Sequence, residues 1–190
     1  IITQLDLRTA NIGSRRTRGL ELAVRANTDL FGGSLTFAMD GTYLLRKREK
    51  FLPSAPYGPS QIGVFTFAGD LGLRWKHNAT VSWSNEDFTF SFTQLFRNGY
   101  QNQQLPGVRN GTVNPPNDIV RTEDYIIYNA SVAYRVSENY TMTLGVRNVF
   151  DTDPPFAITY DSNTGAGSSW EPRVADPRGR SLTVTANVRF

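Results

Sequence analysis

Strict alternation of apolar and polar side chains recurs along most of the 190-residue chain and constrains its fold more than any other feature. In GLELAVRAN (19–27), Leu20, Leu22, Val24 and Ala26 share one face, and the other face carries Glu21, Ala23, Arg25 and Asn27. This period is that of an extended strand with two different faces. It predicts an all-β, antiparallel fold with about seven strands, at 19–27, 34–45, 73–84, 88–96, 126–136, 140–150 and 182–190.

Charged side chains keep to one face of these predicted strands. The apolar faces carry no Asp, Glu, Lys or Arg, and the opposite faces carry Glu21, Arg25, Asp40, Arg74, Lys76, Arg97, Arg135, Arg147 and Arg189. A charge that faces lipid costs about 2–4 kcal/mol at the bilayer midplane, so lipid exposure enforces such segregation. A soluble β-sandwich also alternates, however, and alternation alone leaves both possibilities open.

Strand length and aromatic residues favour the membrane interpretation. The predicted strands match the ~9–11 residues that cross a bilayer and exceed the ~5–6 typical of globular sheets. Aromatic residues gather near the strand ends, as in the two interfacial girdles of a barrel. One predicted girdle contains Tyr43, Trp75, Tyr128 and Phe150, and the other contains Trp83, Phe88, Tyr134, Tyr140 and Phe190.

The connections between the strands alternate in length. Segments 27–33, 84–87 and 137–139 are short, whereas segments 46–71, 98–124 and 151–180 are long. Outer-membrane barrels have short periplasmic turns and long extracellular loops. Counting back from a periplasmic Phe190 places every short turn inside and every long loop outside, so the chain is predicted to be an up-and-down transmembrane meander.

The composition of the chain argues against several classes of function. The 20 Lys and Arg against 17 Asp and Glu give too weak a charge to indicate a nucleic-acid partner. The two basic clusters, SRRTR (14–18) and RKREK (46–50), are interpreted as solvated ends of loops. Cysteine is absent, so no disulfide or thiolate chemistry is expected. The chain opens without the features of a signal peptide, and we expect a mature protein or a piece of a longer chain.

Three motifs resemble the C-terminal part of a TonB-dependent receptor: RGLEL (18–22), NVFDTDPPF (148–156) and DPRGRSLTVTANVRF (176–190). The resemblance implies a 22-stranded barrel in the cell outer membrane, an N-terminal plug, and uptake energised by the TonB complex. Seven strands are about a third of such a barrel, and bacterial barrels have even strand counts. Residues 1–190 are therefore expected to be the C-terminal part of the barrel, with the plug and the remaining strands absent.

The resemblance implies a barrel wall of a transporter for a scarce nutrient, either a siderophore or other metal chelate or an oligosaccharide. Substrate contacts are expected from aromatic and arginine side chains of the long loops: Tyr57, Tyr100, Arg109, Arg121, Tyr160, Trp170 and Arg173. Contacts with the plug or the lumen are expected from Arg25, Arg74, Lys76, Arg135, Arg147 and Arg189. A terminal Phe190 resembles the signal that the barrel-assembly machinery reads. Outer-membrane lipid and a small-molecule substrate complete the expected partners, without nucleic acid.

No catalytic site, metal site or cofactor is expected. The only histidine, His77, lies on a predicted apolar face, and no nucleophile–base pair stands out. Asp151, Asp153 and Asp161 match no calcium-loop spacing and are interpreted as turn residues. Two alternatives stay open: a complete eight-stranded barrel with Ile1–Leu7 as its first strand, and a soluble β-sandwich binding module.

Overall fold

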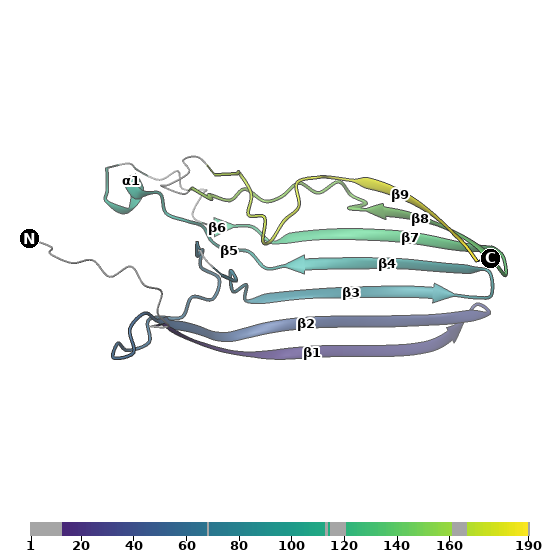
Figure 1. Cartoon of the computed structure of the whole chain (residues 1–190), viewed down its shortest axis with the longest axis horizontal. Coiled ribbons are helices and arrows are strands. Elements are labelled where there is room, and N and C mark those ends of the chain that lie inside the picture. The colour runs from purple at the N-terminus through teal and green to yellow at the C-terminus, as the bar shows by residue number, and fades with distance from the viewer. Residues whose placement is uncertain (1–12, 68, 113, 115–120, 161–166, 190) are drawn as a thin grey trace, which may run out of the picture.

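The computed structural model describes residues 13–67, 69–112, 114, 121–160 and 167–189. Seven antiparallel strands lie side by side in one sheet (Figure 1), in the order β1-β2-β3-β4-β7-β8-β9. This meander confirms the predicted all-β fold and each predicted strand. The strands are β1 (Ser14–Leu30), β2 (Gly33–Lys50), β3 (Trp75–Ser84), β4 (Phe88–Arg97), β7 (Tyr125–Ser137), β8 (Tyr140–Arg147) and β9 (Ser181–Val188).

The long connections differ from the prediction in two respects. The loop expected at 46–71 begins only after Lys50, because β2 and its partner β1 continue well beyond β3. The connection 98–124 contains a two-stranded sheet of β5 (Tyr100–Gln101) and β6 (Arg121–Thr122), and the short helix α1 (Pro106–Arg109). No helix among the described residues is long and apolar enough to cross a membrane.

The strand register aligns the apolar residues into one continuous face. Met39 lies opposite Val24 on β1 and Ala79 on β3, and Phe92 lies opposite Val81 and Ala130. A slip of one residue would move every apolar side chain to the other face. The pairing therefore preserves the segregation of charge that the sequence predicts.

This apolar face is exposed in the described structure. Leu182 and Val184 of β9 are 72% and 68% exposed, and Leu20 of β1 is 60% exposed. Large apolar side chains that cover a whole sheet face need a partner, since soluble proteins rarely expose contiguous apolar patches of this kind. A lipid bilayer is the partner that suits a face without charges.

Aromatic rings follow both ends of the apolar face. At one end Tyr43 packs against Trp75, with ring centres 6.4 Å apart, and Tyr128 packs edge-on against Phe150 at 5.3 Å. At the other end Phe88 stacks on Tyr134 at 4.7 Å, and the Trp83 indole donates a hydrogen bond to the Leu30 carbonyl. Tyr140 lies at this end too, opposite Val188, whereas Phe190 lies outside the described residues.

Three polar side chains on the apolar face form hydrogen bonds with one another. The His77 Nε2 and Gln94 Oε1 atoms are 2.9 Å apart, and the Gln94 amide donates to the Tyr128 hydroxyl. This chain of hydrogen bonds crosses β3, β4 and β7. Hydrocarbon cannot replace water as a hydrogen-bond partner, so this pairing lowers the desolvation penalty of these side chains. Among the described residues, the His77 Nδ1 atom is buried without a partner. The chain of hydrogen bonds gives His77 a structural role.

Tight turns join the strands at the end where the chain terminates, and the long connections gather at the opposite end (Figure 1). The β1–β2 turn has only two central residues, Phe31 and Gly32, and both have positive φ angles, 50° and 71°. Positive φ at both positions matches the twist of a two-residue hairpin. In the β3–β4 turn, the Asn85 side chain accepts hydrogen bonds from the amides of Asp87 and Phe88.

Candidate functional site

The face opposite the apolar one is polar and forms the wall of the candidate site. Its central rows carry hydroxyls: Ser91 lies between Ser82 and Ser131, and the Thr80 and Thr93 hydroxyls are 2.9 Å apart. Small hydroxyl side chains leave the wall open and offer both donors and acceptors. Such a wall suits water, a polar solute or a polar protein surface.

Charged residues also lie on this polar face. Arg25 lies 3.8 Å from Asp40, with both side chains well exposed. Lys76 lies directly opposite Arg97, whose guanidinium donates to the Asn78 side chain. Among the described residues Arg97 pairs with no carboxylate, so this row has an excess of positive charge.

The segment after β8 folds back onto this polar face. Val174 and Ala175 pack on Tyr125 and Ile127 of β7, and both of those β7 residues are only 4% exposed. An apolar cluster on an otherwise polar wall explains why the segment lies there. Burial of these side chains holds the segment against the sheet.

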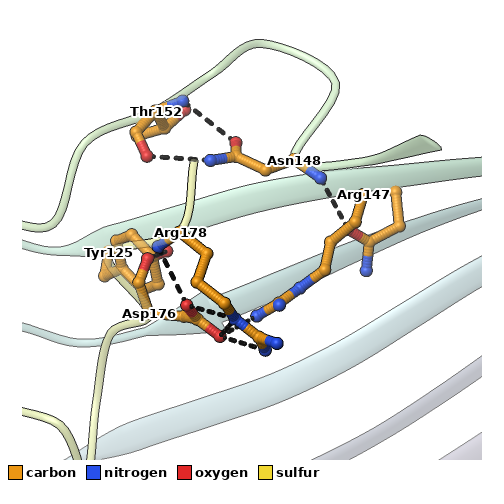
Figure 2. A network of polar contacts seen from close by, with 7 residues as sticks. Tyr125, Arg147, Asn148, Thr152, Asp176 and Arg178 are labelled. Atoms are coloured by element: carbon orange, nitrogen blue, oxygen red, sulfur yellow. Dashed lines mark hydrogen bonds and ion pairs between the residues drawn. The ribbon is translucent and has the colours of Figure 1, made fainter. Parts of the chain in front are cut away.

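Two arginines fix this inward segment at Asp176 (Figure 2). Arg147 of β8 and Arg178 both donate to the Asp176 carboxylate, at 2.5 and 2.6 Å. Hydrogen bonds from Arg178, and then from Arg147, hold the pKa of Asp176 well below its usual range. The Tyr125 hydroxyl donates to the Asp176 backbone carbonyl. We call these contacts the Asp176 anchor.

The NVFD motif closes β8 and reverses the chain beside this anchor (Figure 2). Asn148 is 2% exposed, has a φ of 51°, and exchanges two side-chain hydrogen bonds with the Thr152 backbone. Asp151 accepts a hydrogen bond from the Arg180 amide. The turn that closes β8 includes Asp151, whose φ is 55° and whose backbone amide donates to the Asn148 carbonyl. Asp161 lies outside the described residues, and no group of three His, Cys, Asp or Glu in the described part could hold a metal ion.

The long connections share a small core above the wall. Tyr100, fully buried, packs with Leu71 and Leu73 of the β2–β3 connection and with Ala157 of the β8–β9 connection. Burial raises the pKa of the Tyr100 phenol. Tyr100 is one of the residues expected to contact substrate, and its full burial corrects that expectation. It stabilises the loops and is not free to contact a substrate.

A second ion pair supports this core. Arg173 binds Glu171 through two nitrogens, donates to the Gly69 carbonyl at 3.0 Å, and lies 5.5 Å from the centre of the Phe65 ring. Burial alone would raise the pKa of Glu171, but hydrogen bonds from Arg173 lower it overall. The pair connects the segment after β8 with the segment before β3.

The predicted loop residues separate into different places. Trp170 and Arg173 line one hollow on the polar side, together with Arg97, Arg147 and Arg178. Arg109 and Tyr160 line a second hollow with Phe65 and Phe67. Tyr57 lies away from both, under the Arg16 guanidinium, and Arg121 donates to the Gly99 carbonyl.

The residues expected to face the lumen also divide. Arg25, Lys76 and Arg135 lie on the polar face by register, and Arg147 joins the Asp176 anchor. Arg189 follows β9, and its backbone amide bonds the Asn139 carbonyl. Arg74 precedes β3 and lies 5.9 Å from the Tyr43 ring centre, at the aromatic rim and not in the hollow.

Sequence reasoning missed Asp176, Glu171 and Arg97 as members of this site. Asp176 is the first residue of the motif at 176–190 and is followed by Pro-Arg-Gly. The motif indicated only the approach to the last strand and gave no sign of a partner for the Asp176 carboxylate. Arg97 was placed on the correct face, but its unpaired charge depends on which strand lies beside it. No local pattern in the sequence marks such long-range partners.

Comparison with known proteins places this arrangement in a family. The family model described as "TonB dependent receptor-like, beta-barrel" matches residues 1–149. A mutant of the ferric enterobactin receptor PfeA from Pseudomonas aeruginosa is similar in structure, with a TM-score of 0.56, 17% identity, and coverage of 92% of this chain and 22% of that one. The siderophore receptor PiuA from Acinetobacter baumannii gives a TM-score of 0.51 and 17% identity, covering 93% and 22%.

No curated protein matches the chain. The chain spans about a fifth of the length of the receptors that it resembles in structure. At this level of identity those structures show the common fold. The family model covers most of the chain, and the antiparallel meander of the described strands is consistent with a β-barrel wall: the chain belongs to the TonB-dependent receptor-like β-barrel family.

Proposed function

We propose that this chain is part of the barrel wall of a TonB-dependent transporter in the outer membrane, and that it takes up an anionic metal chelate. The observation that carries the proposal is the polar, inward-facing wall with its arginine-lined hollow, on a sheet whose other face suits lipid. β1 and β9 each have one strand neighbour among the described residues. Further strands would close the barrel, and a plug inside it would receive the TonB complex.

The charge of the hollow supports an anionic substrate. Four guanidinium groups line it, from Arg97, Arg147, Arg173 and Arg178. Two carboxylates oppose them, since Asp176 binds two of the arginines and Glu171 binds a third. Two positive charges are left in excess, beside apolar surface from Leu95, Ile127 and Val174. Aromatic, anionic iron chelates combine these two properties, and the receptors with similar structures are named for ferric enterobactin and siderophores.

A neutral oligosaccharide is the second candidate. Trp170 lines the arginine hollow, and Phe65, Phe67 and Tyr160 line the second one. Aromatic faces also suit the apolar faces of sugar rings. The excess of positive charge favours the chelate. Phe190, the proposed assembly signal, would act before either substrate binds.

The test is binding and uptake by the full-length protein. We expect the purified protein to bind a ferric catecholate, and cells to accumulate radioactive iron from it only when TonB is present. Arg97→Gln should weaken binding by roughly 10- to 100-fold, since one charge-assisted contact is worth about 1.5–3 kcal/mol. Arg180→Gln, which removes a cation outside the hollow, is the matched control. Selective binding of a neutral oligosaccharide would replace the chelate by the second candidate, and uptake without TonB would contradict the transporter.

A further inference from the structure

The β1–β2 hairpin carries an unusual concentration of positive charge where it continues beyond β3. In this part Arg16 lies directly opposite Arg48, and Arg18 lies directly opposite Arg46. Residues two apart on a strand share a face, so these four arginines form a two-by-two array on one side of the hairpin. Lys50 extends the same face. We call these five residues the cationic array.

A β-bulge creates the array. Arg18 pairs with Arg46 but the next residue, Gly19, pairs with Leu44, so Leu45 is the extra residue on β2. One extra residue reverses the alternation of every side chain beyond it. Without the bulge, Arg46 and Arg48 would share the face of Thr42 and point into the lumen. With it, they join Arg16 and Arg18.

The array faces outward, on the same side as the apolar belt. β1 is a regular strand from Arg16 to Leu22, and residues an even number apart on such a strand share a face. Arg16 and Arg18 therefore lie on the same side as Leu20 and Leu22, which is the apolar side. The opposite side of the extension is occupied. Lys47 there is only 2% exposed, and its Nζ atom donates to the Asp70 carbonyl of the loop core. Arg15 on that side is paired with Glu49.

The array lies immediately beyond the aromatic belt that contains Tyr43 and Trp75. Belts of this kind mark the level of the membrane interface. The first row of arginines begins at Arg46, three residues past Tyr43, which is about 10 Å along a strand. Under the proposed function, on which this step rests, that height is the headgroup region of the outer leaflet.

The charge of the array is not neutralised within the described part of the chain. None of its four arginines has an ion pair there, and the Nε atom of Arg48 is buried without a hydrogen-bond acceptor. Tyr57 lies over the array, 4.5 Å from Arg16 and 5.7 Å from Lys50, and supplies only a ring face. Like charges placed directly opposite on a sheet are destabilising. An anion from outside would remove this repulsion.

We propose that the cationic array binds the phosphate groups of a phosphorylated lipid headgroup in the outer leaflet. Paired arginines lie about 5 Å apart across the strands and about 7 Å apart along them. A phosphate between two such side chains can accept several charge-assisted hydrogen bonds at once. The outward direction of the array separates this partner from the transported substrate, which the lumen side would receive.

The test compares full-length protein in phosphatidylcholine nanodiscs that contain either bisphosphorylated lipid A or the same lipid without its phosphates. Native mass spectrometry of the released protein reports the lipid that stays bound. The array variant replaces Arg16, Arg18, Arg46 and Arg48 by Gln. The charge-matched control replaces Arg25, Lys76, Arg135 and Arg189 by Gln on the lumen side.

We expect wild type and control to retain the phosphorylated lipid preferentially, and the array variant to lose that preference by roughly tenfold or more, because several charge-assisted hydrogen bonds are removed together. In detergent without lipid A, the array variant should be at least as heat-stable as wild type, since removing the four arginines relieves the repulsion between them.

Equal retention of the phosphorylated lipid by the array variant would overturn the proposal. So would displacement of the lipid by inorganic phosphate at equal phosphate concentration. An array variant that is less heat-stable than wild type without lipid would also overturn it, because the arginines would then be stabilised by ion pairs within the protein. Failure of the wild type to insert into the discs would count against the transporter itself.

Discussion

The Arg147 guanidinium and the Asp176 carboxylate are joined at 2.5 Å, and they connect the end of β8 to the segment that packs on the polar wall (Figure 2). The two residues are 29 positions apart in the sequence. Their contact fixes where the long connection between β8 and β9 re-enters the sheet. Through Val174 and Ala175 the same segment covers the apolar cluster on β7. The Asp176 anchor therefore shapes the hollow that we propose as the substrate site.

Replacing Asp176 by Asn should loosen the inward segment. The amide keeps the shape of the side chain but loses the charge that both arginines bind. We expect faster hydrogen exchange of the backbone amides at 174–178 and little change in β3 and β4. Asp153→Asn is a control that removes a carboxylate from the same connection but outside the anchor. Unchanged exchange at 174–178 would show that apolar packing alone holds the segment.

The anchor should tolerate mild acid. Because its two arginine partners lower the pKa of Asp176, the closed segment binds fewer protons than a released one with an ordinary Asp pKa of about 3.9. Its stabilisation is complete above about pH 4 and is lost only as the pH falls through the lowered pKa. Exchange at 174–178, corrected for the intrinsic rate, should be the same at pH 7.5 and pH 5.5. A release midpoint near pH 6 would contradict this assignment.

Gly41 should not accept a side chain. The Trp75 ring lies over it, and a Cβ atom there would meet the ring at 2.4 Å. Gly41→Ala must move the indole, and we expect a loss of about 1–3 kcal/mol in the free energy of unfolding, typical of overpacking. Gly145→Ala is the control, because its added Cβ meets only ordinary contacts at 3.9 Å. Urea unfolding in vesicles measures both, and equal stability of the two variants would refute the tight packing.

The stability of the turn at Asn148 should depend both on the hydrogen bonds of the Asn148 side chain and on its positive φ angle. Asn148→Gly keeps the positive φ but loses two hydrogen bonds to Thr152, and Asn148→Ala also strains the backbone. We expect a loss of about 1–3 kcal/mol for Gly from unmet buried polar groups, and a larger loss for Ala. The free energy of unfolding would test the order. Greater stability of the Ala variant would show that φ is not restrictive at this site.

The meander could be predicted from the sequence because its main determinant is local. Period two and the placement of charges located all seven strands, and the register of β2 against β3 then follows from matching apolar faces. The outer parts could not be predicted in this way. Arg46 and Arg48 were interpreted as loop residues, because a bulge at Leu45 interrupts the alternation just before them.

The site was less predictable than the sheet for the same physical reason. Tyr100 was a reasonable surface residue by composition, but its burial depends on Leu71 and Ala157 from distant connections. Asp176 acquires its role only when Arg147 is brought beside it. Contacts between separate loops leave no periodic signal. Ile1–Leu7, proposed as the first strand of a smaller barrel, lies outside the described residues.

The most direct test of the central claim is a pair of neighbouring substitutions on β4. Phe92 lies on the face that we assign to lipid, and Thr93, the next residue, lies on the face that we assign to the lumen. Phe92→Arg should block assembly into the outer membrane or cost about 2–4 kcal/mol, whereas Thr93→Arg should assemble normally. Heat-modifiable migration of the membrane fraction reports folded barrel. Normal assembly of Phe92→Arg together with failure of Thr93→Arg would contradict the membrane assignment.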